Sequence, residues 1–190
     1  MNHLGHLILS GDDPLTITGN FMADAVKGRD LSAYPPGVQQ GIRLHRNIDT
    51  YTDQHPITRV GRERLRAHCG KFAGVALDIF YDHCIAVTWA GPEPLPVFAQ
   101  RMYGLLGAHT HLMPEGARRM LFYLTRHDGL TGYATLEGIA GTLEAMAART
   151  PAAAVLVGAE RVLAEYRDDF VAECSSFLHD LRTQLPRETG

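Results

Sequence analysis

The sequence predicts an all-α fold, organised as a single-domain helical bundle. Glycine and proline divide the chain into segments that are mostly of helical length. Alternation of apolar and polar residues, which is typical of strands, is nearly absent. The length of 190 residues suits one domain with a substantial core, and no repeat, low-complexity tract or linker interrupts it. We therefore expect residues 1–190 to form one all-α domain.

The first half of the chain is expected to contain five helices. Pro36 and Pro56 are placed at first helical turns, where proline is well tolerated, and Gly28 and Gly70 are placed at helix ends. The expected helices cover residues 2–9, 15–27, 36–54, 56–69 and 72–90.

The second half is expected to contain helices at 95–108, 114–127, 135–149 and 152–185, with a turn at residues 128–129. The last of these carries a long apolar stripe, which we expect to pack on the domain rather than to form a coiled coil. The stripe consists of Val155, Val162, Leu163, Tyr166, Phe170, Val171, Phe177, Leu178 and Leu181.

Composition narrows the classes of function. The net charge of -3 excludes a broadly cationic protein, although a local basic patch is still possible. Three scattered cysteines without a CxxC pair argue against a disulfide framework or a thiolate zinc site and suit a reducing cytoplasm. The start MNHLGHLILSGDD has no Lys or Arg, and no apolar run of about 18 residues exists, so we expect neither a signal peptide nor a transmembrane helix. We expect a cytoplasmic enzyme or binding domain that does not enter the membrane.

Charged and imidazole side chains interrupt the apolar fifth helix, in the stretch LDIFYDHCIA at residues 77–86. At about 100° per residue, Asp78 and Asp82 share one face and His83 is turned well away from it. This helix is apolar nearly all round and should be central. An isolated buried carboxylate is costly, so these groups must be protonated, paired with cations or bound to metal.

Three other segments also place His or Asp among apolar residues. His45 and Asp49 are four residues apart on the third helix, Asp24 lies in the second, and His6 lies near the start. Oxygen and imidazole ligands suit Mn²⁺, Mg²⁺, Fe²⁺ or Zn²⁺, and inward-pointing helical ligands can form a metal site in an α-bundle. Each residue also has an ordinary structural alternative, such as a salt bridge, a helix cap or a hydrogen-bonded core histidine.

Residues 56–71 are strongly basic, with five cationic side chains against Glu63 alone, or 5 − 1 = +4. This stretch is either a solvated helix face or a docking surface for an acidic partner. Arg46 could extend that surface or contact a phosphate. Too few aromatic residues are interleaved to favour stacking with single-stranded nucleic acid, so we expect no nucleic-acid partner. The oligomeric state is not predicted.

Four motifs follow one another over roughly residues 1–90, and they are NHLGHL, SGDDPLTITGNFMADAVKG, YPPGVQQGIRLHRNIDTYTD and LDIFYDHCIA. In order and spacing these motifs resemble those of the bacterial acyl-carrier-protein phosphodiesterases. His3 and Gly5 stand where the usual pattern has Phe and Ala. The family is viewed as a divergent branch of the all-α HD-type phosphohydrolases. In this chain the order is Asp82-His83, the reverse of the His-Asp pair after which that superfamily is named.

The resemblance implies a Mn²⁺-dependent enzyme that removes 4′-phosphopantetheine from holo acyl carrier protein to give the apo protein. Other divalent cations could also serve. The matching positions are His6, Asp24, His45, Asp49, Asp53, Asp78, Asp82 and His83. Acyl carrier proteins are strongly acidic, so the basic helix with Arg59, Arg62 and Arg66 is the expected docking surface.

Roles are assigned to these positions as expectations. The predicted metal ligands are Asp24, His45, Asp82 and His83. Asp49 and Asp78 are expected to orient ligands or act as a general base, His6 to act as ligand or acid, and Arg46 to contact the phosphate.

Two other functions are left open by the sequence. One is an HD-like phosphohydrolase that acts on nucleotides or other small phosphodiesters. The other is a helical module that binds an acidic partner without catalysis and holds no stoichiometric metal.

Overall fold

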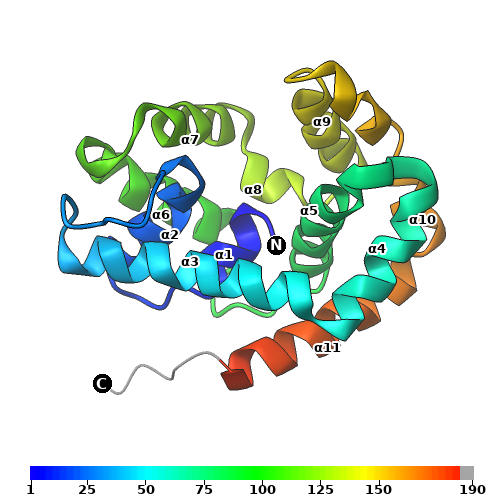
Figure 1. Cartoon of the computed structure of the whole chain (residues 1–190), viewed down its shortest axis with the longest axis horizontal. Helices are drawn as coiled ribbons and strands as arrows, with labels where there is room; N and C mark the ends of the chain where they lie inside the picture. Colours follow the sequence, from blue (N-terminus) through cyan, green and yellow to red (C-terminus); the bar gives the residue numbers. More distant parts are fainter. Residues whose placement is uncertain (185–190) are drawn as a thin grey trace. The chain divides into compact units, whose positions relative to one another are not determined.

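The computed structural model describes residues 1–184, and every regular element in that range is an α-helix or a short 3₁₀ helix (Figure 1). This confirms the predicted all-α fold. The internal contacts group into two compact units, each of which is described by itself. The expectation of one domain over residues 1–190 stays a prediction, and residues 185–190 lie outside the described range.

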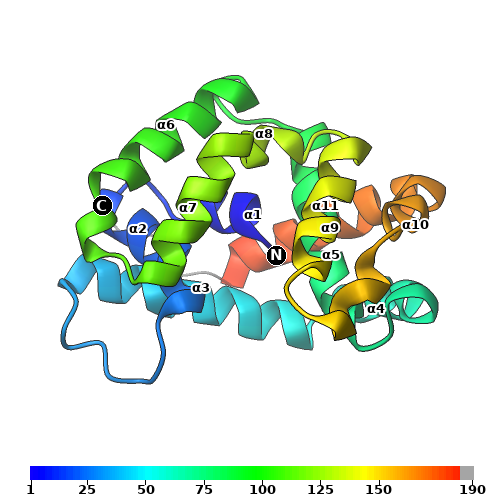
Figure 2. The same cartoon turned by 90° about the horizontal axis from the view of Figure 1, so that it is seen from above.

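The first unit contains residues Met1–Asn2, Tyr51–Trp89 and 132–184. Its core forms where α5 packs against α4, α9 and α11 (Figures 1 and 2). Phe80 and Phe170 meet edge to face at 5.3 Å between ring centroids, and both are fully buried. The unit consists of α4 (Pro56–Cys69), η2 (Gly70–Phe72), α5 (Ala73–Val87), α9 (Leu136–Ala147), η4 (Pro151–Leu156), α10 (Glu160–Glu165) and α11 (Arg167–Gln184).

The second unit contains His3–Thr50 and Ala90–Thr131. Within it α1 packs on α2, α2 on α6, and α6 on α7. Figure 2 shows α6 and α7 side by side in this unit. Its elements are α1 (His3–Ile8), α2 (Pro14–Met22), η1 (Ala23–Ala25), α3 (Pro36–Gln54) as far as Thr50, α6 (Leu95–Ala108), η3 (Thr110–Leu112), α7 (Glu115–His127) and most of α8 (Gly129–Gly132).

Two glycines allow α2 and α3 to approach each other closely. A Cβ atom at Gly19 would lie 2.2 Å from the carbonyl oxygen of Val38, and one at Gly41 would lie 2.1 Å from that of Thr16. No larger residue fits at this crossing without moving one backbone away from the other. The crossing therefore brings Asn20 on α2 next to His45 on α3.

Prolines begin two helices where the sequence predicts them. Pro36 opens α3, and Pro56 opens α4, whose first turn is capped by the Nδ1 atom of His55 accepting from the amide of Ile57 at 3.3 Å. Gly70 follows α4 with φ of +53°, a conformation that favours glycine. The predicted span 56–69 agrees with α4.

Several predicted boundaries were wrong for local backbone reasons. The helix predicted at 15–27 becomes 3₁₀ after Met22, and the chain is extended at Val26. The helix predicted at 72–90 ends at Val87. At residues 128–129 the expected turn is only the left-handed Asp128, with φ of +46°, because α8 begins at the next residue.

The helix predicted at 152–185 is divided in three, and its residue 185 lies outside the described range. Gly158, with φ of +86°, separates η4 from α10, and a non-helical Tyr166 separates α10 from α11. The predicted apolar stripe is therefore only partly buried. Val155 and Tyr166 are exposed, Val162, Val171 and Leu178 are half-buried, and Leu163, Phe170, Phe177 and Leu181 are buried.

Candidate metal centre

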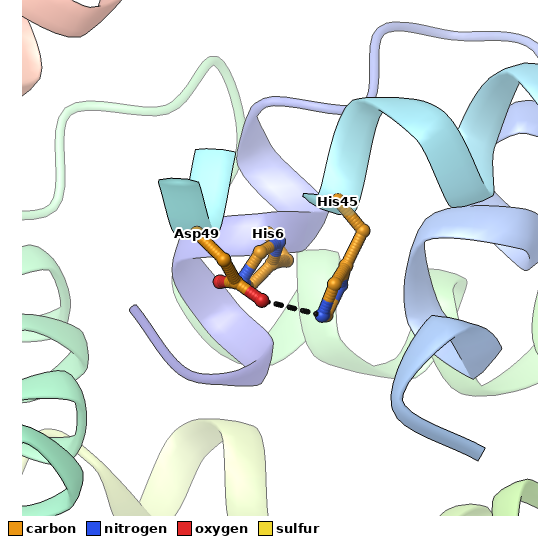
Figure 3. Close-up of side chains that lie close together, drawn as sticks. All are labelled: His6, His45 and Asp49. Atoms are coloured by element: carbon orange, nitrogen blue, oxygen red, sulfur yellow. Dashed lines mark hydrogen bonds and ion pairs between the residues drawn. The ribbon is translucent and has the colours of Figure 1, made fainter. Parts of the chain in front are cut away.

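His6, His45 and Asp49 converge in the second unit and offer the atoms of a metal site (Figure 3). One ligand atom from each of the three lies within 4.8 Å of the others. The two imidazole rings stack with their centroids 4.0 Å apart. Asp49 reaches both, with Oδ1 3.1 Å from Nε2 of His6 and Oδ2 3.1 Å from Nε2 of His45.

Asn20 forms hydrogen bonds with the Nδ1 atoms of both rings. Its Oδ1 accepts from Nδ1 of His6 at 2.9 Å and from Nδ1 of His45 at 3.0 Å. Its Nδ2 group donates to the carbonyl of His6 at 3.1 Å and to the hydroxyl of Ser10 at 2.8 Å. These four bonds satisfy the buried amide and fix its orientation.

This amide determines where the imidazoles carry their protons. Because the amide oxygen can only accept, both histidines must present Nδ1–H to it, so Nε2 of each faces a carboxylate. A neutral Nε2 would set a lone pair against the negative charge of Asp49. The arrangement is favourable when Nε2 is protonated or when a cation lies between the nitrogens and the carboxylate.

The electrostatics of the cluster follow from these contacts. Burial lowers the pKa of His45, but hydrogen bonds to Asp24 and Asp49 outweigh it and raise that pKa to about 9. Burial also lowers the pKa of His6, and its bond to Asp49 opposes this only in part. Burial raises the pKa of Asp49, but the bonds to His45 and His6 bring it well below its usual range. The carboxylate is therefore ionised at neutral pH.

The carboxylate side of the cluster is open. The His6 and His45 side chains are only 4% and 8% exposed, whereas those of Asp49 and Asp24 are 43% and 79% exposed. Asp24 Oδ1 lies 3.2 Å from Nε2 of His45, and that hydrogen bond lowers the pKa of Asp24. Because the imidazoles are buried and the carboxylates are exposed, a ligand can reach the cluster from the carboxylate side.

The predicted residues of α5 lie in the first unit. Asp78 Oδ1 is 2.9 Å from the main-chain nitrogen of Met1, and Asp82 accepts from the amide of Asn2 at 3.2 Å. His83 donates from Nδ1 to the carbonyl of Tyr133 at 2.8 Å. Its Nε2 is buried without a hydrogen-bond partner among the described residues, and burial lowers the pKa of this ring. That bare nitrogen is suited to metal coordination.

The predicted substrate-binding arginines are mostly engaged with the protein itself. Arg46 donates to the carbonyl of Gly28 at 2.9 Å. Arg62 donates to the carbonyl of Asp53 at 2.7 Å, and Arg66 donates from Nε to Glu63 at 3.1 Å. Arg59 is exposed.

Two residues of the cluster, Asn20 and Asp49, differ from the sequence-based assignment. Asn20 was missed, although a polar amide between the apolar Ile17 and Phe21 was a usable signal. Asp49, which was expected to orient ligands, has the geometry of a ligand itself. The donor set of two imidazole nitrogens and a carboxylate fits Mn²⁺, Fe²⁺ or Zn²⁺.

Comparison with known proteins assigns the chain to a family. A family model described as acyl carrier protein phosphodiesterase matches residues 1–181. The acyl carrier protein phosphodiesterase of Photorhabdus laumondii is 33% identical over 175 residues, which cover 90% of this chain and 88% of that protein. Those of Serratia proteamaculans and Yersinia pestis are each 34% identical over 83% of both chains. No solved structure matches the chain.

Proposed function

The chain belongs to the acyl carrier protein phosphodiesterase family, and from this premise we propose that it hydrolyses the phosphodiester of holo acyl carrier protein. In this reaction water adds to phosphorus and the bond from phosphorus to the serine oxygen breaks. The serine oxygen takes a proton, which yields apo carrier and 4′-phosphopantetheine. The observation that carries the proposal is the His6, His45 and Asp49 cluster, whose Nδ1 atoms are already satisfied by Asn20.

We assign His6, His45 and Asp49 as metal ligands, with Asp24 as a further oxygen donor beside His45. A bound divalent cation, Mn²⁺ by resemblance, would neutralise phosphate charge and supply hydroxide at neutral pH. Asn20 holds both rings so that their Nε2 lone pairs face the open side of the cluster. Asp49 is ionised and contacts Nε2 of both rings, so it helps to hold the two rings in place relative to each other.

The earlier assignments on α5 stay predictions. Asp82 and His83 are candidate ligands, supported by complete burial of Asp82 and by the bare Nε2 of His83. Asp78 is a candidate supporting residue. A relation to the HD-type phosphohydrolases, a cytoplasmic location and a role in fatty acid metabolism are likewise proposals.

The decisive experiment incubates the purified protein with Mn²⁺ and holo acyl carrier protein and weighs the carrier by mass spectrometry. We expect the carrier to lose its phosphopantetheine arm. A folded, metal-loaded protein that leaves the arm in place would refute the proposed reaction. If small phosphodiesters or nucleotides are cleaved instead, the enzyme is a phosphohydrolase of small substrates.

The ligand assignment is tested separately by metal content. Asp49→Asn and His45→Gln should each lower bound Mn²⁺ and abolish activity, whereas Asp12→Asn, in an exposed turn of the same unit, should leave both unchanged. Asp24→Asn, Asp82→Asn and His83→Gln are measured in the same way. A variant with full metal content and full activity removes its residue from the site.

A further inference from the structure

Helix α7 presents an aromatic side chain surrounded by arginines. Phe122 is 68% exposed, the most exposed of the large apolar side chains in the described residues. Arg118, Arg119 and Arg126 lie three to four residues away from it along the helix. At about 100° per residue these four residues fall within roughly a third of the helix circumference. They form one exposed surface, which we call the α7 face.

The opposite side of α7 is firmly packed. Ala117, Leu121 and Leu124 are buried, and the helix contacts α6 and η1. A Cβ at Gly116 would be in ordinary van der Waals contact with η1, 3.5 Å from Cβ of Ala25. Because η1 also carries Asp24, the α7 face belongs to an element packed directly against the turn that borders the metal cluster.

The α7 face has cationic charge that the protein does not neutralise. Arg119 pairs with Glu115 one turn away. Arg118 donates to the carbonyl of Met113 at 2.7 Å, which leaves its charge uncompensated. Within the described residues neither Arg118 nor Arg126 forms an ion pair with a carboxylate.

The arginines of α4 differ in this respect. Arg64 forms a two-pronged bond with Glu173 at 2.8 and 3.0 Å and lies 3.8 Å from Asp169. Arg62 pairs with Asp53, and Arg66 pairs with Glu63. Three arginines of α4 thus pair with four carboxylates, which are Asp53, Glu63, Asp169 and Glu173, whereas Arg59 forms no ion pair within the described residues. With Lys71, residues 56–71 set five cations against these four carboxylates, or 5 − 4 = +1. The charge that made residues 56–71 a candidate docking surface is largely cancelled by the fold.

We propose that the α7 face, rather than α4, docks the acidic carrier protein. The inference rests on the proposed function for the identity of the partner. Arginine and aromatic side chains dominate the energetics of protein interfaces, and an exposed apolar residue ringed by cations fits an acidic surface with an apolar centre. Charge complementarity orients the carrier during encounter, and Phe122 supplies apolar contact once the two proteins meet.

The test measures binding and catalysis separately. Binding of fluorescently labelled holo acyl carrier protein is followed by anisotropy after chelation of metal, so that no turnover occurs. Removal of the arm with Mn²⁺ is followed by mass spectrometry, and hydrolysis of bis(p-nitrophenyl) phosphate reports on the metal site without docking. The variants are Arg118→Glu/Arg126→Glu and Phe122→Ser. Arg149→Glu/Arg161→Glu is the control with the same change in charge, on exposed arginines of the first unit.

The α7 double variant should weaken carrier binding and lower kcat/KM for the carrier by about tenfold or more, with unchanged hydrolysis of the small diester. Phe122→Ser should weaken binding at low and high salt alike, and the charge effect should shrink as salt rises. The control should bind like the wild type. Circular dichroism verifies that each variant is folded, and Arg118→Gln/Arg126→Gln replaces the reversal if it does not fold.

Two outcomes would overturn the proposal. One is carrier binding by the α7 variants that equals the wild type. The other is an equal loss in Arg149→Glu/Arg161→Glu or in Arg59→Glu/Arg66→Glu. Failure of the proposed reaction is recognised differently, because wild-type protein would then bind the carrier through the α7 face but leave its arm in place.

Discussion

Replacing Asn20 tests whether this amide orients the metal-binding imidazoles. In Asn20→Leu the two Nδ1–H donors of His6 and His45 lose their shared acceptor inside the protein. A buried donor without a partner costs about 1–3 kcal/mol, so two such donors should lower the free energy of unfolding by about 2–6 kcal/mol. Removing the orienting partner of metal-binding histidines typically costs about 10–100-fold in metal affinity.

The assay compares Mn²⁺ affinity by calorimetric titration with unfolding by urea of the metal-free protein. Asn20→Asp keeps the accepting oxygen and should retain the metal affinity that Asn20→Leu loses. Thr18→Val is the matched control on the same helix, because Thr18 is fully buried and donates only to the carbonyl of Pro14 at 2.7 Å. It should cost about 1 kcal/mol of stability and leave metal affinity unchanged. A folded Asn20→Leu protein that binds Mn²⁺ as the wild type does would refute the reasoning.

Three further outcomes follow from the structure. The pKa of His45 is about 9 in the folded protein, above its usual 6.5, so protonated His45 stabilises the metal-free fold below pH 6.5, and this stabilisation is lost as pH rises through 9. Mn²⁺ binding requires the deprotonated ring, so calorimetric titrations should show Mn²⁺ affinity rising about tenfold per pH unit between pH 7 and 8. A Mn²⁺ affinity that does not change with pH would contradict this prediction. Gly41→Ala should lower both the urea midpoint and the Mn²⁺ affinity, because the new Cβ would lie 2.1 Å from the carbonyl oxygen of Thr16. Gly104→Ala is the control: a Cβ there has nothing within 4 Å, so the free energy of unfolding should rise by up to about 1 kcal/mol. Arg64→Lys keeps the charge but loses the two-pronged bond to Glu173, so urea unfolding should show a free energy of unfolding lower by about 1–2 kcal/mol. An unchanged urea midpoint would show that the pair does not stabilise the protein.

Much of the helical architecture could be predicted from local signals. Pro36 and Pro56 begin their helices as expected, and the apolar run around Phe80 forms a helix buried on nearly all sides. The predictions were wrong where one backbone angle decided the outcome. The positive φ of Gly158 divides the last segment, although the apolar spacing there suits a continuous helix.

The residue types of the candidate site could be predicted from the sequence, but which of those residues lie together in space could not. The spacing of His45 and Asp49 correctly places both on one face of α3. The pattern within α2 marks Asn20 only as a polar side chain among apolar neighbours, because its role depends on the crossing of α2 and α3. The net charge of α4 could not be read from its own segment for a similar reason, since two of the carboxylates that pair with Arg64, Asp169 and Glu173, lie on α11, far away along the chain.

The all-α class, the family motifs and the supply of imidazole and carboxylate ligands follow from the sequence, because helical periodicity and residue chemistry are local properties. Which of those ligands meet depends on how the helices pack. Gly19 and Gly41 let two backbones approach until one amide, Asn20, reaches both imidazoles. Contacts between residues distant in the chain depend on how surfaces pack, and packing also decides which arginines have charge left for a partner.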